Sequence, residues 1–408
     1  MSSVDKMVTV RPRTYSLPSY SLTGDLLGFL RCGLQYRYTR VGRLPSSRPV
    51  QLWFGEFIHG VMEEAYRRYD EWQKRGVPSV PPWPEAELKS IRDLIEARLA
   101  ARGLVPWDDE LERIGRERAD TAVNELGPHL FPLIHRAEVR LTGARSLPAI
   151  DPALQFREAD RYEMVGVIDV VTHVQLHDPR FAANPIVRAI LKTLPERPGD
   201  RFEVIIDYKG MRRPPYEGGE GPIGLWTQYA WQLMTYAEIR RHQPDALPVA
   251  AGVLIYINEL HPTRSDLETL KREVTGARTD VLPVAGSAAA DILRRWGTKD
   301  PLPGAERSVL PPLPFEYRLD RALRVVPVTQ EAIRAALSAF DGVVERIETC
   351  LGKECHGQPI LKAWERNATA ESTCVVCDSR TYCPDYQIQY ASRHGEKQPR
   401  LPGVRVRA

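Results

Sequence analysis

The chain has 408 residues, with 43% hydrophobic and 27% charged residues, values that are typical of a globular protein. Its 56 Lys and Arg residues and 53 Asp and Glu residues give a net charge of +3, which permits nucleic-acid binding without indicating it. No apolar run approaches the roughly 20 residues of a transmembrane helix, and Met1–Val10 lacks the apolar segment of a signal peptide. We therefore expect a cytoplasmic protein that does not contact membranes.

The N-terminal part of the chain predicts helices after an irregular start at Met1–Pro18. Ser19–Cys32 is expected to form a helix that Ser21 or Thr23 caps and that ends at Cys32. Apolar residues recur at helical spacing over Trp53–Lys74. Further helices are expected at Glu85–Arg102 and Asp108–Leu126. Residues 1–132 are accordingly predicted to form an N-terminal helical region.

Strand patterns begin after Pro132 and predict an α/β core over residues 133–330. Val204-Ile205-Ile206 is continuously apolar, as in a strand that is buried on both faces. Proline-containing segments at 177–200 and 264–314 are interpreted as insertions, and residues 331–408 as a C-terminal helix followed by a cysteine-rich region. The expected strands are Ile134–Leu141, Glu163–His173, Phe202–Tyr208, Val249–Ile257 and Glu316–Val326, and the expected helices are Gly224–Arg241 and Thr329–Cys350.

Three short strings hold the residues that predict chemistry. Gly166-Val167-Ile168-Asp169 ends an apolar strand with a carboxylate, and Asp207-Tyr208-Lys209 ends the next one. Two carboxylates at neighbouring strand ends form an oxygen-rich site for Mg2+ or Mn2+. Lys209 follows Asp207 by two residues, so both side chains lie on the same face of the strand. A metal ion and a lysine together suit phosphodiester hydrolysis, because both stabilise negative charge in the transition state.

Four cysteines predict a second site, which binds metal. Cys374, Cys377 and Cys383 have C-x2-C-x5-C spacing near the C-terminus, and Cys32 is the obvious fourth ligand. Thiolates this close together, in a chain without secretory features, indicate metal binding rather than disulfides. Such a site would join the two ends of the chain. Loss of any one of the four cysteines is then expected to destabilise the protein and to abolish DNA binding.

The order of these elements resembles the PD-(D/E)XK nuclease superfamily, in its RecB-like branch. Asp169, the D-x-K of Asp207 and Lys209, and the Q-x3-Y of Gln232 and Tyr236 follow that branch's order. Gly55-x3-His59 resembles its G-x3-H element, and the split cysteines resemble its iron–sulfur members, of the AddB, Dna-two and CRISPR-associated exonuclease types. The chain has no Walker A string, so no helicase motor is expected.

The resemblance implies a restriction-endonuclease-like fold, with a mixed sheet flanked by helices, and a role for each motif residue. His59, Asp169, Asp207 and the carbonyl of Tyr208 would bind Mg2+ or Mn2+, and Lys209 would act on the attacking water. Gln232 and Tyr236 would orient the lysine or the phosphate. Cys32, Cys374, Cys377 and Cys383 would hold a 4Fe–4S cluster.

The implied activity is a metal-dependent deoxyribonuclease, an exonuclease on single-stranded DNA ends, in DNA repair, recombination or antiviral defence. Its partners would be DNA and a helicase or defence-complex subunits. One alternative is a nucleic-acid-binding subunit with a silent or partner-activated site; RNA as substrate and Zn2+ at the cysteines also stay open.

Each motif residue also has a plainer structural interpretation. His59 can be an ordinary helix histidine, the two aspartates strand-end caps, Lys209 a surface charge, and Gln232 with Tyr236 a helix face. Trp226, Tyr229 and Trp231 fit packing better than base stacking, and Cys350 and Cys355 are expected to be free thiols. Basic residues around the motifs fit either phosphate contacts or a solvated face. They are Arg37, Arg40, Arg43, Arg212, Arg213, Arg240 and Arg241.

Overall fold

A mixed seven-stranded sheet forms the centre of the computed structural model, which describes residues 16–44, 51–77, 81–216, 224–296, 313–391 and 393. The strand order is β1-β3-β5-β6-β7, with β2 beside β3 and β4 beside β5. β5 runs parallel to β6 and antiparallel to β3, and β2 runs antiparallel to β3. The strands are β1 Ser19–Ser21, β2 Ile134–Ser146, β3 Arg161–Thr172, β4 Val174–Gln175, β5 Arg201–Lys209, β6 Val249–Tyr256 and β7 Leu323–Pro327.

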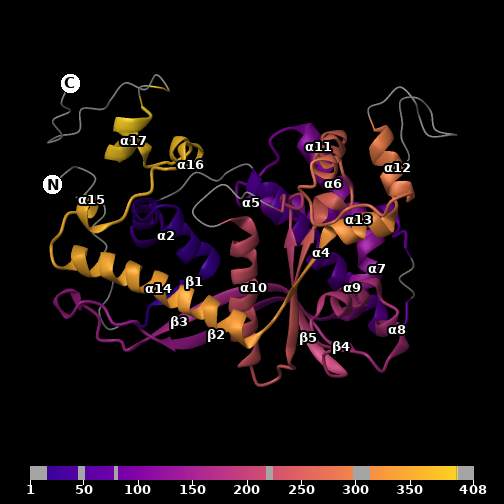
Figure 1. Cartoon of the computed structure of the whole chain (residues 1–408), viewed down its shortest axis with the longest axis horizontal. Helices are drawn as coiled ribbons and strands as arrows, with labels where there is room; N and C mark the ends of the chain where they lie inside the picture. Colours follow the sequence, from indigo (N-terminus) through magenta and orange to yellow (C-terminus); the bar gives the residue numbers. More distant parts are fainter. Residues whose placement is uncertain are drawn as a thin grey trace.

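Helices cover both faces of this sheet, which confirms the expected fold class of a mixed sheet flanked by helices. Figure 1 shows α10 and α14 on one side of β5, and α4 and α6 on the other. The longer helices are α4 Gln51–Lys74, α5 Glu85–Ala101, α6 Asp109–Thr121, α9 Pro185–Thr193, α10 Leu225–Arg241, α11 Arg264–Thr275, α12 Ala288–Arg295, α13 Phe315–Ala322 and α14 Gln330–Cys355. Among the described helices, none has the length and apolar composition of a membrane span.

Short helical segments connect these elements. Five lie in the N-terminal half of the chain before β2: η1 Leu22–Leu26, α2 Leu27–Arg31, α3 Gly33–Tyr36, η2 Arg37–Val41 and η3 Ala122–Leu126, with α7 Gly127–Leu130 and η4 Phe131–Leu133 leading into β2 itself. The others are η5 Pro152–Leu154, α8 Pro179–Ala182, η6 Ile257–Glu259, α15 Ile360–Ala363, α16 Glu371–Val375, η7 Arg380–Tyr382 and α17 Pro384–Gln389.

Strand β5 is buried on both faces, as its apolar run predicts. Val204 and Ile206 belong to the core under α4, α5 and α6, whereas Ile205 belongs to the core under α10 and α14. Alternation of side chains along a strand sends neighbours to opposite faces. The strand therefore ends, at Asp207–Lys209, between two layers of helices.

The helix expected at Ser19–Cys32 is wrong in its first turn. Ser19–Ser21 instead pairs in parallel with β3, and the helical turns start at Leu22. Ser21 precedes them, but its hydroxyl makes no cap; its backbone N–H donates to the carboxylate of Asp25 at 2.8 Å. The strand pairing satisfies backbone groups that a longer helix would also have used. Most of the irregular Met1–Pro18 segment lies outside the described residues.

The strand expected at Glu316–Val326 is also wrong in its first half, which is helix α13. Tyr317 and Leu319 are buried on that helix, so packing rather than β-propensity decides the local structure. The other expected helices and strands are found with bounds that shift by a few residues.

The two segments interpreted as insertions contain ordered structure. Residues 177–200 include α8 and α9, and Ile186, Val187 and Ile190 of α9 are completely buried in the core that contains β5. Residues 264–314 include α11 and α12, and their last part lies outside the described residues. α9 therefore contributes to the main core.

Candidate active site

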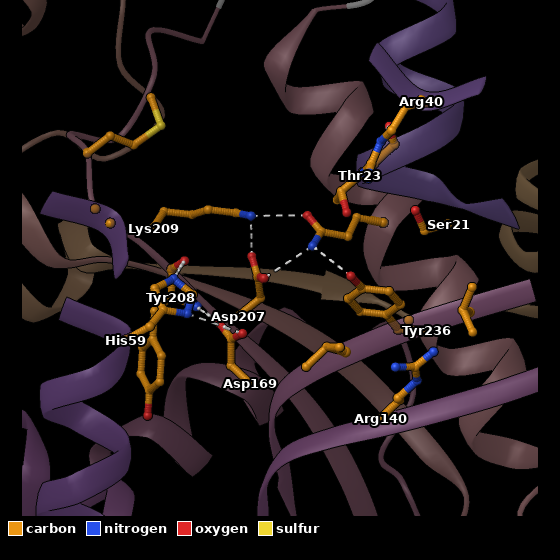
Figure 2. A pocket seen from close by; sticks show the side chains of 18 residues that line it. Ser21, Thr23, Arg40, His59, Arg140, Asp169, Asp207, Tyr208, Lys209 and Tyr236 are labelled. Atoms are coloured by element: carbon orange, nitrogen blue, oxygen red, sulfur yellow. Dashed lines mark hydrogen bonds and ion pairs between the residues drawn. The ribbon is translucent and has the colours of Figure 1, made fainter. Parts of the chain in front are cut away.

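One open cavity of about 810 Å3 is lined by all seven residues that the nuclease motifs predict. Figure 2 shows them converging from one long helix on one side, two strands below and α10 on the other. They are His59 of α4, Asp169 of β3, Asp207, Tyr208 and Lys209 of β5, and Gln232 and Tyr236 of α10.

The two aspartates meet because of the strand register. Val170 pairs with Ile206 and Val171 with Ile205, so one further residue in this antiparallel register places Asp169 opposite Asp207. Both carboxylates are buried. Asp169 also accepts a hydrogen bond from the backbone N–H of Tyr208 at 2.7 Å, which fixes its orientation against β5.

His59 contacts two of the proposed metal ligands through its two ring nitrogens. Its Nδ1 lies 3.3 Å from Asp169 Oδ1, and its Nε2 lies 3.1 Å from the carbonyl oxygen of Tyr208. Burial lowers the pKa of His59, but the carboxylates of Asp169 and Asp207 outweigh burial and raise that pKa to about 9. The metal-free protein therefore holds an imidazolium between these oxygen atoms at neutral pH.

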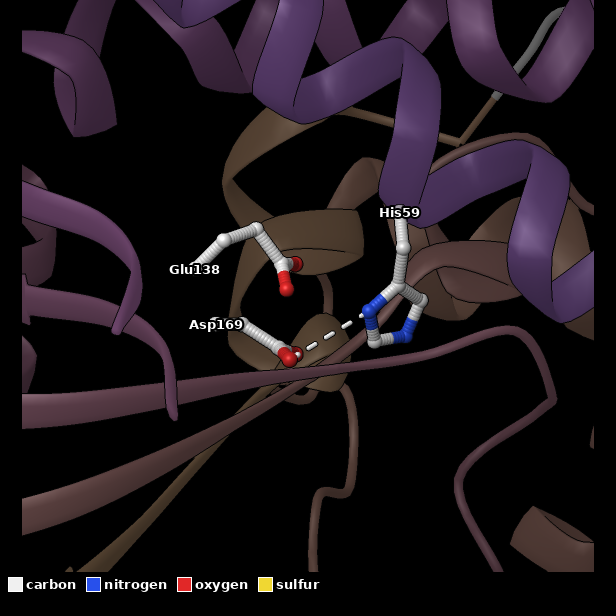
Figure 3. Close-up of side chains that lie close together, drawn as sticks. All are labelled: His59, Glu138 and Asp169. Carbon is white, nitrogen blue, oxygen red and sulfur yellow. Dashed lines mark ion pairs between the residues drawn. The ribbon is translucent and has the colours of Figure 1, made fainter. Parts of the chain in front are cut away.

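Glu138 is a further site residue, which the sequence analysis missed. His59, Glu138 and Asp169 each offer a ligand atom, and these atoms all lie within 4.8 Å of one another (Figure 3). Partial withdrawal from water, followed by the charge of Asp169, raises the pKa of Glu138 to about 7, although its side chain remains exposed. Only the register of β2 and β3 reveals this residue, because it places Glu138 opposite Asp169.

The backbone of Glu138 is in the left-handed region, with φ of 50°. This conformation costs a non-glycine residue about 1–3 kcal/mol, and such residues cluster at functional sites. The strained position turns an exposed strand residue toward His59 and Asp169. A glutamate that is held at such a cost, within reach of two metal-ligand types, fits a binding role better than a structural one.

Asp207 faces a different set of partners from Asp169. It forms an ion pair with Lys209 and accepts a hydrogen bond from Gln232 Nε2 at 3.2 Å. Burial raises the pKa of Asp207, and the positive charge of Lys209 offsets that shift only in part. Asp207 therefore lies beside the His59–Glu138–Asp169 group without belonging to it in the metal-free protein.

Gln232 links the strand residues to α10. Lys209 Nζ donates to Gln232 Oε1 at 3.0 Å, and Gln232 Nε2 also donates to the hydroxyl of Tyr236 at 3.2 Å. The Lys209 ammonium lies 4.4 Å from the centre of the Tyr229 ring, a cation–π distance. These contacts hold the lysine in one position inside the cavity.

Gly166 explains how Tyr236 reaches this network. A Cβ at Gly166 would lie 2.6 Å from the Tyr236 ring, so any larger residue would displace the tyrosine. Trp231 is buried and donates to the carbonyl of Ala336 at 2.8 Å, whereas Trp226 stacks on the Arg324 guanidinium at 3.6 Å. Of the three aromatic residues considered for base stacking, only Tyr229 contacts a motif residue.

Several basic residues, which the sequence left open as phosphate contacts or as a solvated face, are paired within the protein. Arg212 pairs with Glu273 at 3.0 Å, and the buried Arg213 donates to Asp280 at 2.7 Å. Arg240 pairs with Glu203 at 2.7 Å, in the core. Arg37 pairs with Glu354, and Arg241 pairs with Glu238. Of the basic residues singled out from the sequence, Arg40 and Lys209 line the cavity, and the structure adds Arg140 of β2.

The four cysteines of the second predicted site line one small pocket, and none forms a disulfide. Burial, followed by the neighbouring thiols Cys383, Cys32 and Cys377, raises the pKa of Cys374 to about 11. Figure 1 shows α16 and α17 beside α2, so the two ends of the chain are close together. Among the described residues, no three of these sulfur atoms lie within 4.8 Å of one another, whereas the ligand atoms of His59, Glu138 and Asp169 do.

Comparison with known sequences supports a nuclease. No curated protein matches the chain. A family model described as the PD-(D/E)XK nuclease superfamily matches residues 24–180, which include Cys32, His59, Glu138 and Asp169 but end before Asp207. Nucleases of this superfamily use divalent metal ions, and the acidic group around His59 is compatible with that use. The chain is therefore similar to PD-(D/E)XK nucleases over this segment, which is less than half of its length.

Proposed function

We propose that the protein is a Mg2+- or Mn2+-dependent deoxyribonuclease that degrades single-stranded DNA from an end, in DNA repair, recombination or antiviral defence. One observation carries the proposal: the His59–Asp169 pair shares one open cavity with a lysine that a carboxylate and an amide hold. Hydrolysis of a phosphodiester needs both, because charge develops on the attacking and leaving oxygen atoms.

The donor set fits a divalent cation. His59, Glu138 and Asp169 are within mutual reach, and Asp207 and the Tyr208 carbonyl lie on the adjoining strand. Carboxylate and carbonyl oxygens are ligands that Mg2+ and Mn2+ prefer. A bound cation would lower the pKa of a water molecule and stabilise charge on the phosphate. A bound cation would also reduce the repulsion among these carboxylates, and this reduction would favour cation binding.

Lys209 is proposed to act on the attacking water and on the charged phosphate oxygens. Asp207 and Gln232 fix its ammonium group, and the Tyr229 ring covers one side of it. A fixed positive charge in a partly buried site stabilises a developing negative charge without further reorganisation. Tyr236 acts through Gln232 and therefore has a positioning role in this proposal.

Action at an end is supported by the different charges of two neighbouring cavities. A second cavity of about 420 Å3 shares Gly55, His59 and Asp169 with the first and continues past Glu138. It is lined by Glu56, Glu63 and Glu138 and by two arginines, Arg98 and Arg102, of which Arg102 pairs with Glu56 at 3.0 Å. The glutamates outnumber the arginines on that side, so we expect the strand to extend into the first cavity and the products to be short.

The cysteines are proposed to hold a 4Fe–4S cluster that joins the ends of the chain. The four thiol donors around one pocket fit such a cluster, whose contribution here would be structural.

The test is cleavage of end-labelled single- and double-stranded DNA and RNA by anaerobically purified protein, with Mn2+, Mg2+ or EDTA. Cleavage that needs metal and is lost in Asp207→Ala and Lys209→Ala is expected, with visible absorption from the cluster. The lengths and labels of the products give the polarity. A folded protein that binds DNA but cleaves nothing would instead indicate a binding subunit with a silent or partner-activated site.

A further inference from the structure

One wall of the first cavity continues away from the acidic group along β2 and β3. Arg140 of β2 pairs directly with Val167 of β3, and Thr142 pairs with Val165. The same register places Glu138 opposite Asp169, two residues farther along each strand. Side chains two residues apart share a strand face and are separated by about 7 Å. Arg140 and Val167 therefore lie about one nucleotide step from the proposed metal ligands.

Arg140 is a cation without a protein partner at this wall. Its side chain is exposed and lines the cavity, and no hydrogen bond or ion pair joins it to any of the described residues. This sets it apart from Arg212, Arg213 and Arg240, which carboxylates neutralise. An uncompensated guanidinium inside a concave surface attracts anions, and phosphate matches its planar set of donors.

Arg40 adds a second cation from the N-terminal region. Its Nε donates to the carbonyl of Gly24 at 3.0 Å, and no carboxylate pairs with it among the described residues. A Cβ at Gly24 would lie 1.9 Å from Arg40 Nη2, so the absence of a side chain there permits this position of the guanidinium. Figure 2 shows both arginines on the side of the cavity opposite His59, with Arg140 near Tyr236 and Arg40 beside Thr23.

Apolar side chains lie next to these cations. Val165 and Val167 line the cavity, and Val167 is 46% exposed, although it lies on a central strand. Cations beside a row of apolar side chains suit single-stranded nucleic acid. Its phosphates can contact the cations, and its sugars and bases can contact the apolar side chains.

We propose that Arg140 and Arg40 form a phosphate-binding subsite for the nucleotides next to the scissile bond, with Val165 and Val167 contacting their sugars and bases. The subsite deepens the proposed nuclease function and rests on it. It also gives a direction, because the strand extends from Asp169 along β3 toward Val165 and away from the acidic second cavity. A paired duplex would keep its bases from the valine stripe, so the subsite selects single strands.

The test measures binding of fluorescent oligothymidylate to protein with the Asp207→Asn change, which removes cleavage. Arg140→Ala and Arg40→Ala should each weaken binding several-fold and reduce the slope of log affinity against log salt by about 0.7, the value for one phosphate contact on a single strand. Arg188→Ala is the matched control, because Arg188 is exposed on α9, outside the cavity and without a partner among the described residues.

Gly24→Ala gives a second test that keeps every charge. The added Cβ would lie 1.9 Å from Arg40 Nη2 and 2.7 Å from Ser21 Oγ, and both atoms are side-chain ends that can rotate away without backbone movement. Weaker binding with an unchanged unfolding temperature is expected. Val167→Thr should reduce affinity for the single strand and leave the salt slope unchanged, because it alters an apolar contact only.

Two results would overturn the subsite: salt slopes that Arg140→Ala and Arg40→Ala leave unchanged, or no binding of oligothymidylate at all. Failure of the nuclease proposal looks different. If the unmodified protein cleaves nothing but the arginine variants change the salt slope, the subsite stands and the catalytic assignment falls. If the unmodified protein cleaves and both arginine variants retain its KM and salt slope, the nuclease stands and the subsite falls.

Discussion

The two candidate metal-binding regions differ in what holds their donor atoms. The acidic group uses regular strands, since Glu138, Asp169 and Asp207 occupy neighbouring positions on β2, β3 and β5. The cysteines lie at interruptions: Cys32 separates α2 from α3, and the other three surround the short helices α16, η7 and α17. Regular strands of the core therefore position the carboxylates, whereas only short helices and the turns between them position the cysteines.

The two regions also differ in the charge of their donor groups. The acidic group gathers carboxylates whose repulsion is relieved by the His59 imidazolium and the Lys209 ammonium. In the other region, burial raises the pKa values of Cys374, Cys377 and Cys383, so these three thiols are neutral and do not repel one another. The acidic site is therefore preorganised at an energetic cost to the fold, whereas the metal-free cysteine region is relaxed but weakly specified.

The largest effect is expected from Asp207→Asn. Cleavage should fall by roughly 10³-fold or more, the scale for losing a transition-state charge contact. The unfolding temperature should not fall, because the raised pKa of Asp207 means that its ionised form disfavours the native state at neutral pH. Thermal unfolding alongside the cleavage assay checks both. A lower unfolding temperature with cleavage retained would identify Asp207 as a structural cap.

Cys377→Ala tests the other region and should act on a limited segment. Trp364 is buried against Phe29 and Tyr36, and the Leu34 N–H donates to the carbonyl of Glu365 at 2.8 Å. These contacts join the chain ends independently of the cysteines. We therefore expect weaker DNA binding and a small decrease in unfolding temperature, rather than the complete loss of binding expected from the sequence, together with loss of visible absorption and proteolysis after about residue 366.

The matched control is Cys355→Ala, which changes a cysteine outside the proposed set. Its absorption spectrum and proteolysis pattern should equal those of the unmodified protein. A Cys377→Ala protein that keeps its chromophore and resists protease would contradict a four-cysteine site. Complete unfolding would instead show that the cluster, rather than the Trp364 contacts, provides the main connection between the ends.

The sequence predicted the acidic site better than its surroundings for a physical reason. The apolar runs that end in Asp169 and Asp207 indicate the ends of buried strands, because a short apolar run is a local sequence signal for a buried strand. Glu138 has no such local signal; its role depends on pairing across β2 and β3 and on a left-handed backbone. The sequence could not show which arginines are paired, since ion pairs such as Arg213–Asp280 join residues far apart in sequence.

The helix at Phe315–Ala322, expected as a strand, shows the same limit. Tertiary packing of Tyr317 and Leu319 determines that this segment is helical, and a short stretch of sequence does not contain the residues against which they pack. The expected helices over Trp53–Lys74 and Gly224–Arg241 were confirmed because long periodic patterns specify both element and buried face. The motif residues that follow a local pattern therefore line one cavity as expected, whereas Glu138, whose position depends on strand register, was missed.

Glu138→Gln should have a smaller effect and separates metal binding from fold. The amide keeps the shape but removes a charge, so affinity for Mn2+ should decrease by about tenfold, the lower end for loss of a residue that supports a metal site. The metal-free protein should unfold at an equal or higher temperature, since repulsion with Asp169 is lost. Calorimetric titration measures the affinity, and Glu63→Gln, in the same second cavity, is the control. Equal losses in both variants would indicate only a general electrostatic effect.

The smallest expected effect is the pH dependence of metal affinity, which compares the two regions directly. The pKa of Glu138 is raised to about 7 and that of His59 to about 9, so both hold protons that a cation must displace near neutral pH. Lower pH favours the protonated ligands, and affinity for Mg2+ should therefore rise steadily between about pH 6 and about pH 8.

Calorimetry in buffers of different ionisation enthalpy counts the protons released. Glu138→Gln should release fewer protons near pH 7, whereas Cys377→Ala should leave the count unchanged, because the thiols take no part in the preorganised acidic site. A proton count that stays at zero would mean that the cation does not replace the imidazolium contacts of His59, and the metal would then have to bind elsewhere in the cavity.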